Sequence, residues 1–228
     1  MSTLTKLLNN ASPSAITHAP DNAIFIWVPK NAGTSLLDAL KRGAGFSRFK
    51  RIKDLRRGFD QCGRVTFGHM DCRSLIRSGY VKQEFYDSAY KFGLVRNPYT
   101  RAVSLFLYLK KEGRIKQAVS FLEFCEGLAG GVVEPIGLYN SKGLSQCNPQ
   151  VTWLKEVDMD YLGRFEELGE TFGNIAKVFE MPTVTLPHLN SSDKESVRQF
   201  YCERAQDIVE VYYREDFEAF GYDYWSRE

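Results

Sequence analysis

The sequence has no long apolar run. Its longest uninterrupted apolar stretch is residues 23–28, whereas a membrane-spanning helix needs about 20 such residues. Residues 1–20 contain no long apolar segment followed by small residues, so they do not match a secretory signal peptide. We therefore expect a soluble, cytoplasmic protein in which residues 1–20 form a loosely attached arm and residues 21–228 form a single domain.

Paired cysteines and an excess of charge are also missing. The five cysteines include no CxxC pair, which fits a reducing compartment better than a disulfide framework. The spacing of Cys62, His69 and Cys72 matches no common zinc pattern, so we expect no bound metal. A net charge of +2 is too small to indicate nucleic acid as the partner. Hydrophobic residues make up 43% of the chain, which is enough for a packed core.

Buried strands alternate with helices along the chain. Apolar segments predict strands at 23–28, 64–68, 88–95 and 160–166. Helices are expected at 34–42, at 98–111 with Asn97 as N-cap, at 167–180, and as one long final helix that begins near the capping-box sequence at 192–195. This order predicts an α/β fold of three layers, with a central parallel sheet flanked by helices.

The segment AIFIWVPKNAGTSLLDALKR, residues 23–42, places a turn between a buried strand and a helix. The first turn of a helix has unpaired N–H groups and the positive end of the helix dipole, so this P-loop-like junction predicts a site for a phosphate or a related anion. Gly33 allows close approach of the backbone, and Thr34 and Ser35 add hydroxyl donors. The junction is not a Walker A loop, because Lys30 precedes the glycine.

Two motifs carry a family resemblance. VPKNAGTSL (28–36) and LVRNPYTRAVSLF (94–106) resemble the 5′-phosphosulfate and 3′-phosphate segments of sulfotransferases that use 3′-phosphoadenosine-5′-phosphosulfate (PAPS). The segments GRFEEL (163–168), LPHLNSS (186–192) and YYREDFEAFGY (212–222) resemble carbohydrate sulfotransferases related to the heparan 2-O- and chondroitin/dermatan 4-O-enzymes. The resemblance implies sulfuryl transfer from PAPS to a hydroxyl of a glycan or glycosylated small molecule, with adenosine 3′,5′-bisphosphate (PAP) as product.

The resemblance also assigns donor-binding residues. Lys30 would contact the sulfuryl group and the bridging oxygen, and the predicted donor site comprises Lys30, Asn31, Gly33, Thr34, Ser35, Arg96 and Ser104. Arg96 and Ser104 would hold the 3′-phosphate, since an arginine grips a phosphate with a bidentate fork. Ser104 could instead bond back to its own helix, and Arg101 is either a second phosphate ligand or a surface charge.

Sulfuryl transfer further requires a base that removes the acceptor's hydroxyl proton. His69 follows the strand at 64–68. Lys30, His69 and Arg96 would then all lie at carboxyl ends of parallel strands, where the sites of such sheets gather. His69 is therefore the predicted catalytic base, with Asp71 and Glu166 as competing candidates.

The segment RFKRIKDLRR, residues 48–57, contains six Lys or Arg residues in ten. It is either a solvated surface or a site for an anionic acceptor bound by Lys50, Arg51 and Lys53. Two other classes of function stay open. A phosphotransferase that uses ATP would share the strand–turn–helix anion site, and a non-catalytic module would bind anionic glycans or nucleic acid through this segment.

Overall fold

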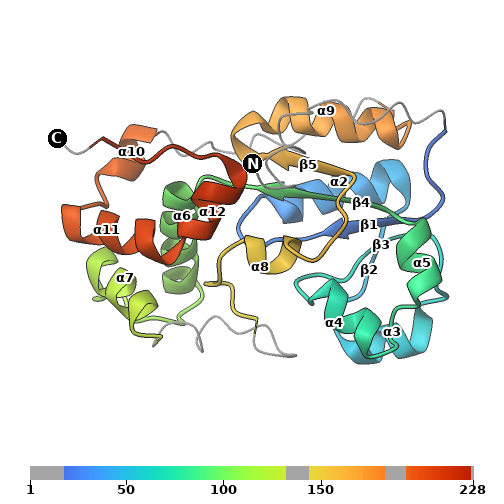
Figure 1. Cartoon of the computed structure of the whole chain (residues 1–228), viewed down its shortest axis with the longest axis horizontal. Helices are drawn as coiled ribbons and strands as arrows, with labels where there is room; N and C mark the ends of the chain where they lie inside the picture. Colours follow the sequence, from blue (N-terminus) through green and yellow to red (C-terminus); the bar gives the residue numbers. More distant parts are fainter. Residues whose placement is uncertain (1–17, 132–143, 183–193, 227–228) are drawn as a thin grey trace. The chain divides into compact units, whose positions relative to one another are not determined.

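The computed structural model describes residues 18–131, 144–182 and 194–226 (Figure 1). The chain divides into two compact units, which we describe separately. Unit 1 comprises residues 1–95 and 153–189, and unit 2 comprises residues 96–152 and 190–228. The expected arm at 1–20 lies almost entirely outside the described residues, and a single domain over 21–228 stays a prediction.

In the described residues, unit 1 contains a five-stranded sheet in the order β2-β3-β1-β4-β5, and every pairing is parallel. The strands are β1 (Ala23–Ile26), β2 (Ser47–Arg48), β3 (Arg64–Thr66), β4 (Tyr90–Val95) and β5 (Tyr161–Arg164). The central parallel sheet predicted from the sequence is therefore confirmed.

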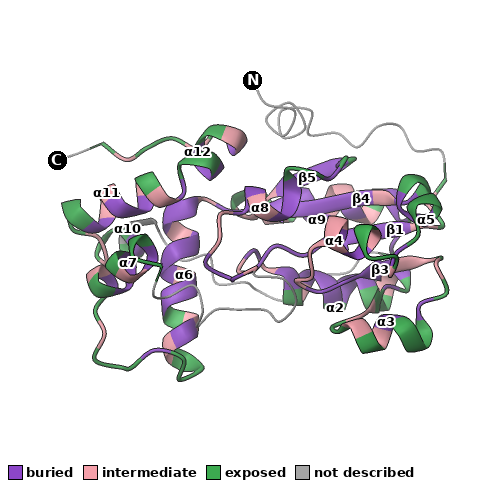
Figure 2. Ribbon diagram, turned by 60° about the horizontal axis from the view of Figure 1, so that its bottom comes forward, coloured by how far each residue is buried: buried purple, intermediate pink, exposed green. Residues whose placement is uncertain are grey.

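Helices lie on both sides of this sheet. Helices α2 (Gly33–Ala44) and α9 (Leu168–Val178) share one apolar cluster with residues of β1, β4 and β5. Helices α3 (Ile52–Gly58), α4 (Cys72–Arg77) and α5 (Gln83–Ser88) lie on the other side of the strands (Figure 1). Every residue of β1 is buried (Figure 2). Burial on both faces explains the unbroken apolar sequence of this strand.

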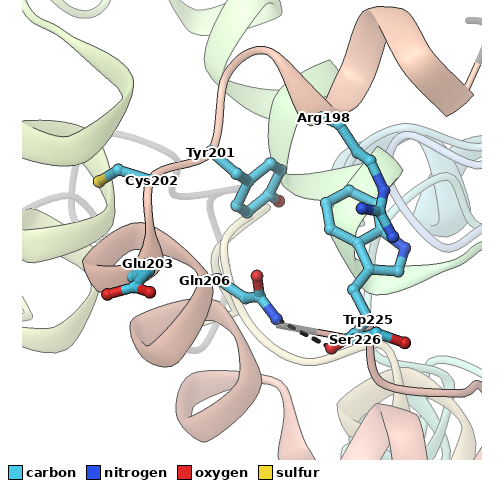
Figure 3. A pocket seen from close by; sticks show the side chains of 7 residues that line it. All are labelled: Arg198, Tyr201, Cys202, Glu203, Gln206, Trp225 and Ser226. Atoms are coloured by element: carbon cyan, nitrogen blue, oxygen red, sulfur yellow. Dashed lines mark hydrogen bonds between the residues drawn. The ribbon is translucent and has the colours of Figure 1, made fainter. Parts of the chain in front are cut away.

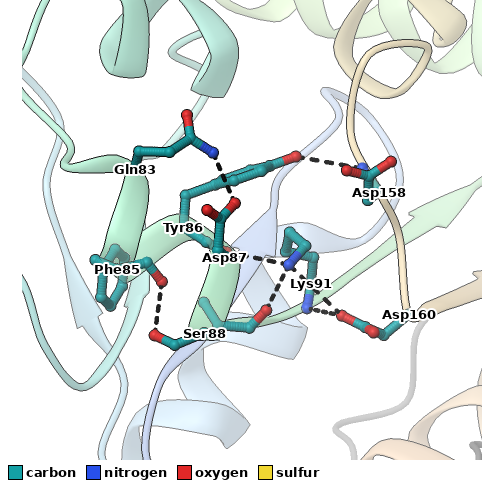
Figure 4. Close-up of polar contacts among 9 residues, drawn as sticks. Gln83, Phe85, Tyr86, Asp87, Ser88, Lys91, Asp158 and Asp160 are labelled. Carbon is teal, nitrogen blue, oxygen red and sulfur yellow. Dashed lines mark hydrogen bonds and ion pairs between the residues drawn. The ribbon is translucent and has the colours of Figure 1, made fainter.

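A buried lysine anchors β4 near its amino end (Figure 4). Lys91 Nζ donates to the carbonyl oxygens of Tyr86 at 3.1 Å and Ala89 at 2.7 Å, at the C-terminal end of α5. It also lies 4.0 Å from the carboxylate of Asp160. A cation is favourable there because the last carbonyls of a helix carry the negative end of its dipole. Lys91 therefore ties α5 to the sheet, at the end of β4 opposite to Arg96.

The described part of unit 2 is helical. It contains α6 (Pro98–Lys111), α7 (Phe121–Ala129), α10 (Lys194–Arg198), α11 (Glu203–Tyr212) and α12 (Arg214–Phe220), and the short α8 (Val151–Leu154) begins in it. Buried residues of α6, α7 and α11 form one apolar cluster. Helix α6 begins as predicted: Asn97 Oδ1 accepts a hydrogen bond from the Tyr99 N–H at 3.0 Å, and Pro98 is the first helical residue.

The prediction of one long final helix is wrong. The apolar stripe over 197–212 is divided between α10 and α11, with a turn at 199–202. In that turn the Tyr201 N–H donates to the Arg198 carbonyl at 2.9 Å, and the Tyr201 ring packs edge-on against Phe121 at 4.8 Å. Most of the stripe is buried as expected, although Val211 is exposed. Apolar spacing does not reveal a break between two helices that pack into the same core.

Candidate functional site

The turn between β1 and α2 contains two residues in the left-handed backbone region. The φ angle is 71° at Lys30 and 57° at Ala32, values that non-glycine residues rarely adopt. Ala32 is the N-cap of α2, so no N-cap side chain accepts from the N–H groups of the first helical turn. Thr34 is exposed and Ser35 partly exposed on that turn. The first turn therefore presents backbone and hydroxyl donors together, an arrangement suited to an anion.

The indole of Trp27 requires a glycine at the start of α2. A Cβ atom added to Gly33 would lie 1.9 Å from Trp27 Nε1. The indole is buried and stacks on Phe25 with ring centroids 6.1 Å apart. The guanidinium of Arg48 lies 4.2 Å from the indole centroid. The sequence indicated a glycine for close approach of a ligand, and the structure adds a second reason, which is packing against Trp27.

We expect Gly33→Ala to destabilise the protein, because the added methyl group displaces either the indole or the start of α2. Overpacking of this kind costs about 1–3 kcal/mol, which thermal unfolding measures as a lower Tm. Gly173→Ala in α9 is the matched control, because a Cβ there meets nothing within 4 Å. The control should keep or raise the Tm, since alanine is the better helix residue. Equal Tm values for Gly33→Ala and wild type would contradict the packing account.

The side chain of Asn31 serves the fold. It is 2% exposed, and its Nδ2 donates to the carbonyl oxygen of Leu94 at 2.7 Å. Leu94 belongs to β4, so this bond holds the turn against the neighbouring strand. The sequence predicts Asn31 as a donor-binding residue, and that role stays a prediction beside this structural one.

His69 lies three residues beyond β3 and is tied to the segment that leads into the turn. Its Nδ1 lies 2.8 Å from the carbonyl oxygen of Trp27, and the two rings are tilted with centroids 4.7 Å apart. The His69 carbonyl in turn accepts a hydrogen bond from Trp153 Nε1 at 3.4 Å. A carbonyl oxygen can only accept, so Nδ1 carries the hydrogen and the neutral ring has its lone pair on Nε2. That tautomer is the one a base acting through Nε2 needs.

The competing bases have different surroundings. Asp71 is the N-cap of α4, and its carboxylate accepts from the backbone N–H of Arg73 at 3.1 Å and from the hydroxyl of Ser74. Its Oδ2 also lies 3.6 Å from the guanidinium of Arg77. Glu166 is exposed in the 3-10 turn Phe165–Glu167. The cap and the ion pair engage both oxygens of Asp71, which gives this carboxylate a structural role.

The basic segment, residues 48–57, runs from the last residue of β2 through most of α3. Arg51 pairs with Asp54 at 3.2 Å, and its guanidinium lowers the pKa of that carboxyl. Arg56 donates to the Tyr80 hydroxyl at 2.7 Å. Lys50 and Lys53 are exposed. Part of the segment is therefore engaged within unit 1, and of the three predicted acceptor-binding residues the two lysines are the better candidates.

At the start of α6 in unit 2, three polar residues follow one another at intervals of four, which places them along one side: Arg96, Thr100 and Ser104. Arg96 is the residue that follows β4, and it is 6% exposed. Its Nε donates to Thr100 Oγ1 at 2.9 Å, which directs the guanidinium along the helix. Ser104 is partly exposed. The structure thus brings the two predicted 3′-phosphate residues onto a common side and adds Thr100, which the sequence did not single out.

Arg101 is not a surface charge. It is fully buried, and its Nη2 donates to the carbonyl oxygens of Gln146 at 2.8 Å and Asn148 at 3.1 Å. Its guanidinium also lies 5.5 Å from the Tyr213 ring centroid. The surface-charge alternative is therefore wrong, and Arg101 holds the segment before α8 in place, a role that the sequence did not suggest.

Unit 2 also contains a hollow of about 220 Å³ (Figure 3). Gln206 Nε2 donates to the Trp225 carbonyl at 3.2 Å, and the Arg198 guanidinium lies 5.0 Å from the Trp225 ring centroid. The lining residues are Arg198, Tyr201, Cys202, Glu203, Gln206, Trp225 and Ser226. None of the predicted site residues lines it, so we do not assign the chemistry to this hollow.

Metal and membrane features were searched over the same described residues. No group of three or more His, Cys, Asp or Glu side chains among them is placed to hold a metal ion. No helix in this part of the chain combines the length and apolar character needed to cross a bilayer.

The chain matches a family model in sequence and solved structures in fold. The model of the sulfotransferase family matches residues 14–223. A sulfotransferase from Alicyclobacillus acidocaldarius superposes with a TM-score of 0.50 and 15% identity, covering 90% of this chain and 97% of that one. Mouse sulfotransferase SULT7A1 complexed with PAP superposes with a TM-score of 0.53 and 12% identity, covering 95% and 91%.

No curated protein sequence matches the chain significantly. At 12–15% identity the structural similarity supports the fold alone. The family match covers nearly the whole sequence, and it includes the turn with Lys30, the segment with His69 and the start of α6. The chain belongs to the sulfotransferase family.

Proposed function

We propose that this sulfotransferase moves a sulfuryl group from PAPS to a hydroxyl of a carbohydrate or a glycosylated small molecule. The observation that carries the proposal lies at the carboxyl ends of β1 and β3, which are neighbours in the parallel sheet. The turn with Lys30 follows β1, and His69 follows β3 with its Nδ1 bonded to the Trp27 carbonyl. A cation for the leaving oxygen and an imidazole for the incoming hydroxyl are the groups that this transfer requires.

Family membership and the two anion-binding segments favour PAPS as the donor. The N–H groups of the first turn of α2, with the hydroxyls of Thr34 and Ser35, would hold the 5′-phosphosulfate. Arg96 and Ser104 would hold the 3′-phosphate. Arg96 Nε donates to Thr100, and the guanidinium fork is the kind of group that binds a phosphate. The mouse sulfotransferase of similar fold is a complex with PAP.

The transfer is a direct displacement at sulfur. The acceptor hydroxyl oxygen forms a bond to sulfur while its proton passes to His69 Nε2, and the bond between sulfur and the bridging oxygen breaks. The negative charge that develops on that oxygen is stabilised by the ammonium group of Lys30, and PAP leaves. The electron pair of the broken bond stays with PAP, so the step needs no oxidant or reductant.

Nucleotide binding to the wild-type protein tests the donor assignment. Calorimetry should give a tighter Kd for PAP than for adenosine 5′-monophosphate, by about tenfold to a hundredfold, because the additional 3′-phosphate forms charged hydrogen bonds. Adenosine 5′-phosphosulfate should likewise bind more weakly than PAPS. Equal affinity for the two nucleotides of either pair would overturn the assignment of the 3′-phosphate site.

The acceptor is proposed to be anionic and to bind beside α3. Replacing both Lys50 and Lys53 by alanine should then raise the acceptor KM more than the PAPS KM, and the difference should shrink at high salt because exposed charges are screened. Steady-state kinetics at two ionic strengths measure this. Lys41→Ala with Arg42→Ala, at the exposed C-terminal end of α2, removes the same charge as a control. If the acceptor KM changes equally in both double variants, the basic segment is a solvated surface and does not bind the acceptor.

A further inference from the structure

A single buried side chain forms hydrogen bonds with both the N–H and the carbonyl oxygen of Arg96. Gln150 is 0% exposed, and its Oε1 accepts from the Arg96 N–H at 2.9 Å. Its Nε2 donates to the Arg96 carbonyl oxygen at 2.8 Å. One carboxamide therefore pairs with both backbone polar groups of Arg96, at the point where β4 has ended and α6 has not begun.

The carboxamide is itself fixed by Asp216, which is also 0% exposed. Asp216 Oδ2 accepts from Gln150 Nε2 at 3.2 Å and from the Gln150 N–H at 2.9 Å. Asp216 Oδ1 accepts from the Val151 N–H at 3.0 Å. Burial raises the pKa of this carboxyl, while the charge of Arg101 and these hydrogen bonds act in the opposite direction. The carboxyl thus fixes both the backbone and the side chain of Gln150.

These bonds form a chain from α12 through Gln150 to Arg96, all within unit 2. They fix the Cα position from which the guanidinium extends. A separate bond, from Arg96 Nε to Thr100, fixes the direction of the guanidinium itself. Buried polar groups that are fully paired hold a rigid geometry, whereas removing one partner leaves the others buried and unpaired.

We propose that Gln150, oriented by Asp216, is a positioning residue that presents Arg96 to the 3′-phosphate of the donor. Gln150 does not touch the donor in this account. It acts only through the backbone of Arg96, so it affects recognition of the 3′-phosphate and leaves contacts with the rest of the nucleotide unchanged. The inference rests on the proposed donor assignment and extends it.

The test compares Kd values for PAP and adenosine 5′-monophosphate in wild type, Arg96→Ala, Gln150→Ala and the double variant. Arg96→Ala should weaken PAP about tenfold to a hundredfold, as expected for loss of charged hydrogen bonds, and leave the monophosphate unchanged. Gln150→Ala should weaken PAP about threefold to tenfold, with the monophosphate again unchanged. In the Arg96→Ala background, Gln150→Ala should not weaken PAP binding further. The two substitutions are then not additive, because Gln150 acts through Arg96.

Two further variants separate positioning from folding. Gln150→Met keeps the length of the side chain without its hydrogen bonds, so it should reproduce the selective loss with a smaller packing defect. Gln146→Ala is the matched control, because Gln146 is also buried in the same segment and its Oε1 has no hydrogen-bond partner among the described residues. Gln146→Ala should retain the wild-type ratio of the two Kd values. Thermal unfolding of each variant reports the folded fraction.

The outcomes distinguish this inference from the function on which it rests. Wild-type protein that binds both nucleotides equally overturns the donor assignment, and the inference with it. If Arg96→Ala loses PAP selectively but Gln150→Ala and Gln150→Met do not, the donor assignment stands and the positioning role is wrong. Equal weakening of both nucleotides in the Gln150 variants also overturns it, because a general structural role would have that effect.

Discussion

We expect His69→Ala to lower kcat for sulfuryl transfer by about 10²–10⁴-fold, the range for removal of a general base. The Kd of PAP should stay near the wild-type value, because the imidazole bonds to the Trp27 carbonyl and acts on the acceptor hydroxyl. Protonation of the ring removes the lone pair on Nε2. Where chemistry limits the rate, wild-type activity should therefore fall toward acid pH. The variant should not show this fall.

His69→Asn separates the two roles of this side chain. An asparagine amide can still donate to the Trp27 carbonyl, but it cannot take a proton from the acceptor. We therefore expect His69→Asn to be as inactive as His69→Ala, and we expect His18→Ala, at an exposed position, to be fully active. A kcat within a few-fold of wild type in either His69 variant would reject His69 as the base, and Glu166 would be the next carboxylate to examine.

The second large effect is expected at Lys30. Replacement by methionine keeps the length of the side chain and removes its charge, and it should lower kcat by about 10²–10³-fold, as for loss of one group that stabilises developing negative charge. The charge on the bridging oxygen grows as PAP departs, so the ammonium group stabilises the transition state more than the bound donor. Single-turnover kinetics together with PAP calorimetry measure the two effects separately.

Lys30→Arg is the control for charge at this position. It retains a cation on the left-handed turn and should recover part of the kcat lost in Lys30→Met. If Lys30→Met instead weakens PAP binding as strongly as it lowers kcat, the ammonium group contributes to ground-state binding alone, and its assigned role at the leaving oxygen is wrong.

The turn after β1 and the start of α6 could be predicted because their signals are local. An apolar strand, a glycine-containing turn and an amphipathic run follow one another at 23–44, and Asn97 with Pro98 marks the next helix start within two residues. The parallel sheet follows from the alternation of such segments. Each of these features depends on neighbours in the sequence, which a single chain displays directly.

The support of the site depends on contacts between distant residues. Gln150 lies 54 residues from Arg96 and 66 residues from Asp216, and nothing in its surrounding sequence marks it as a partner of either. The role of Trp27 in requiring Gly33 likewise emerges only when the two are seen in contact. Arg101 shares α6 with Ser104, yet it is buried, because the helix turns its side chain toward carbonyl oxygens far along the chain.

The most direct measurement of the central claim follows the sulfuryl group itself. The protein is incubated with PAPS labelled in its sulfuryl group and a panel of neutral and anionic glycans and glycosides, and both products are quantified. The account predicts one labelled sulfate ester formed on an acceptor hydroxyl for each PAP released, and no phosphate transfer from ATP under the same conditions. Absence of label on every acceptor, together with transfer of the terminal phosphate of ATP, would contradict it.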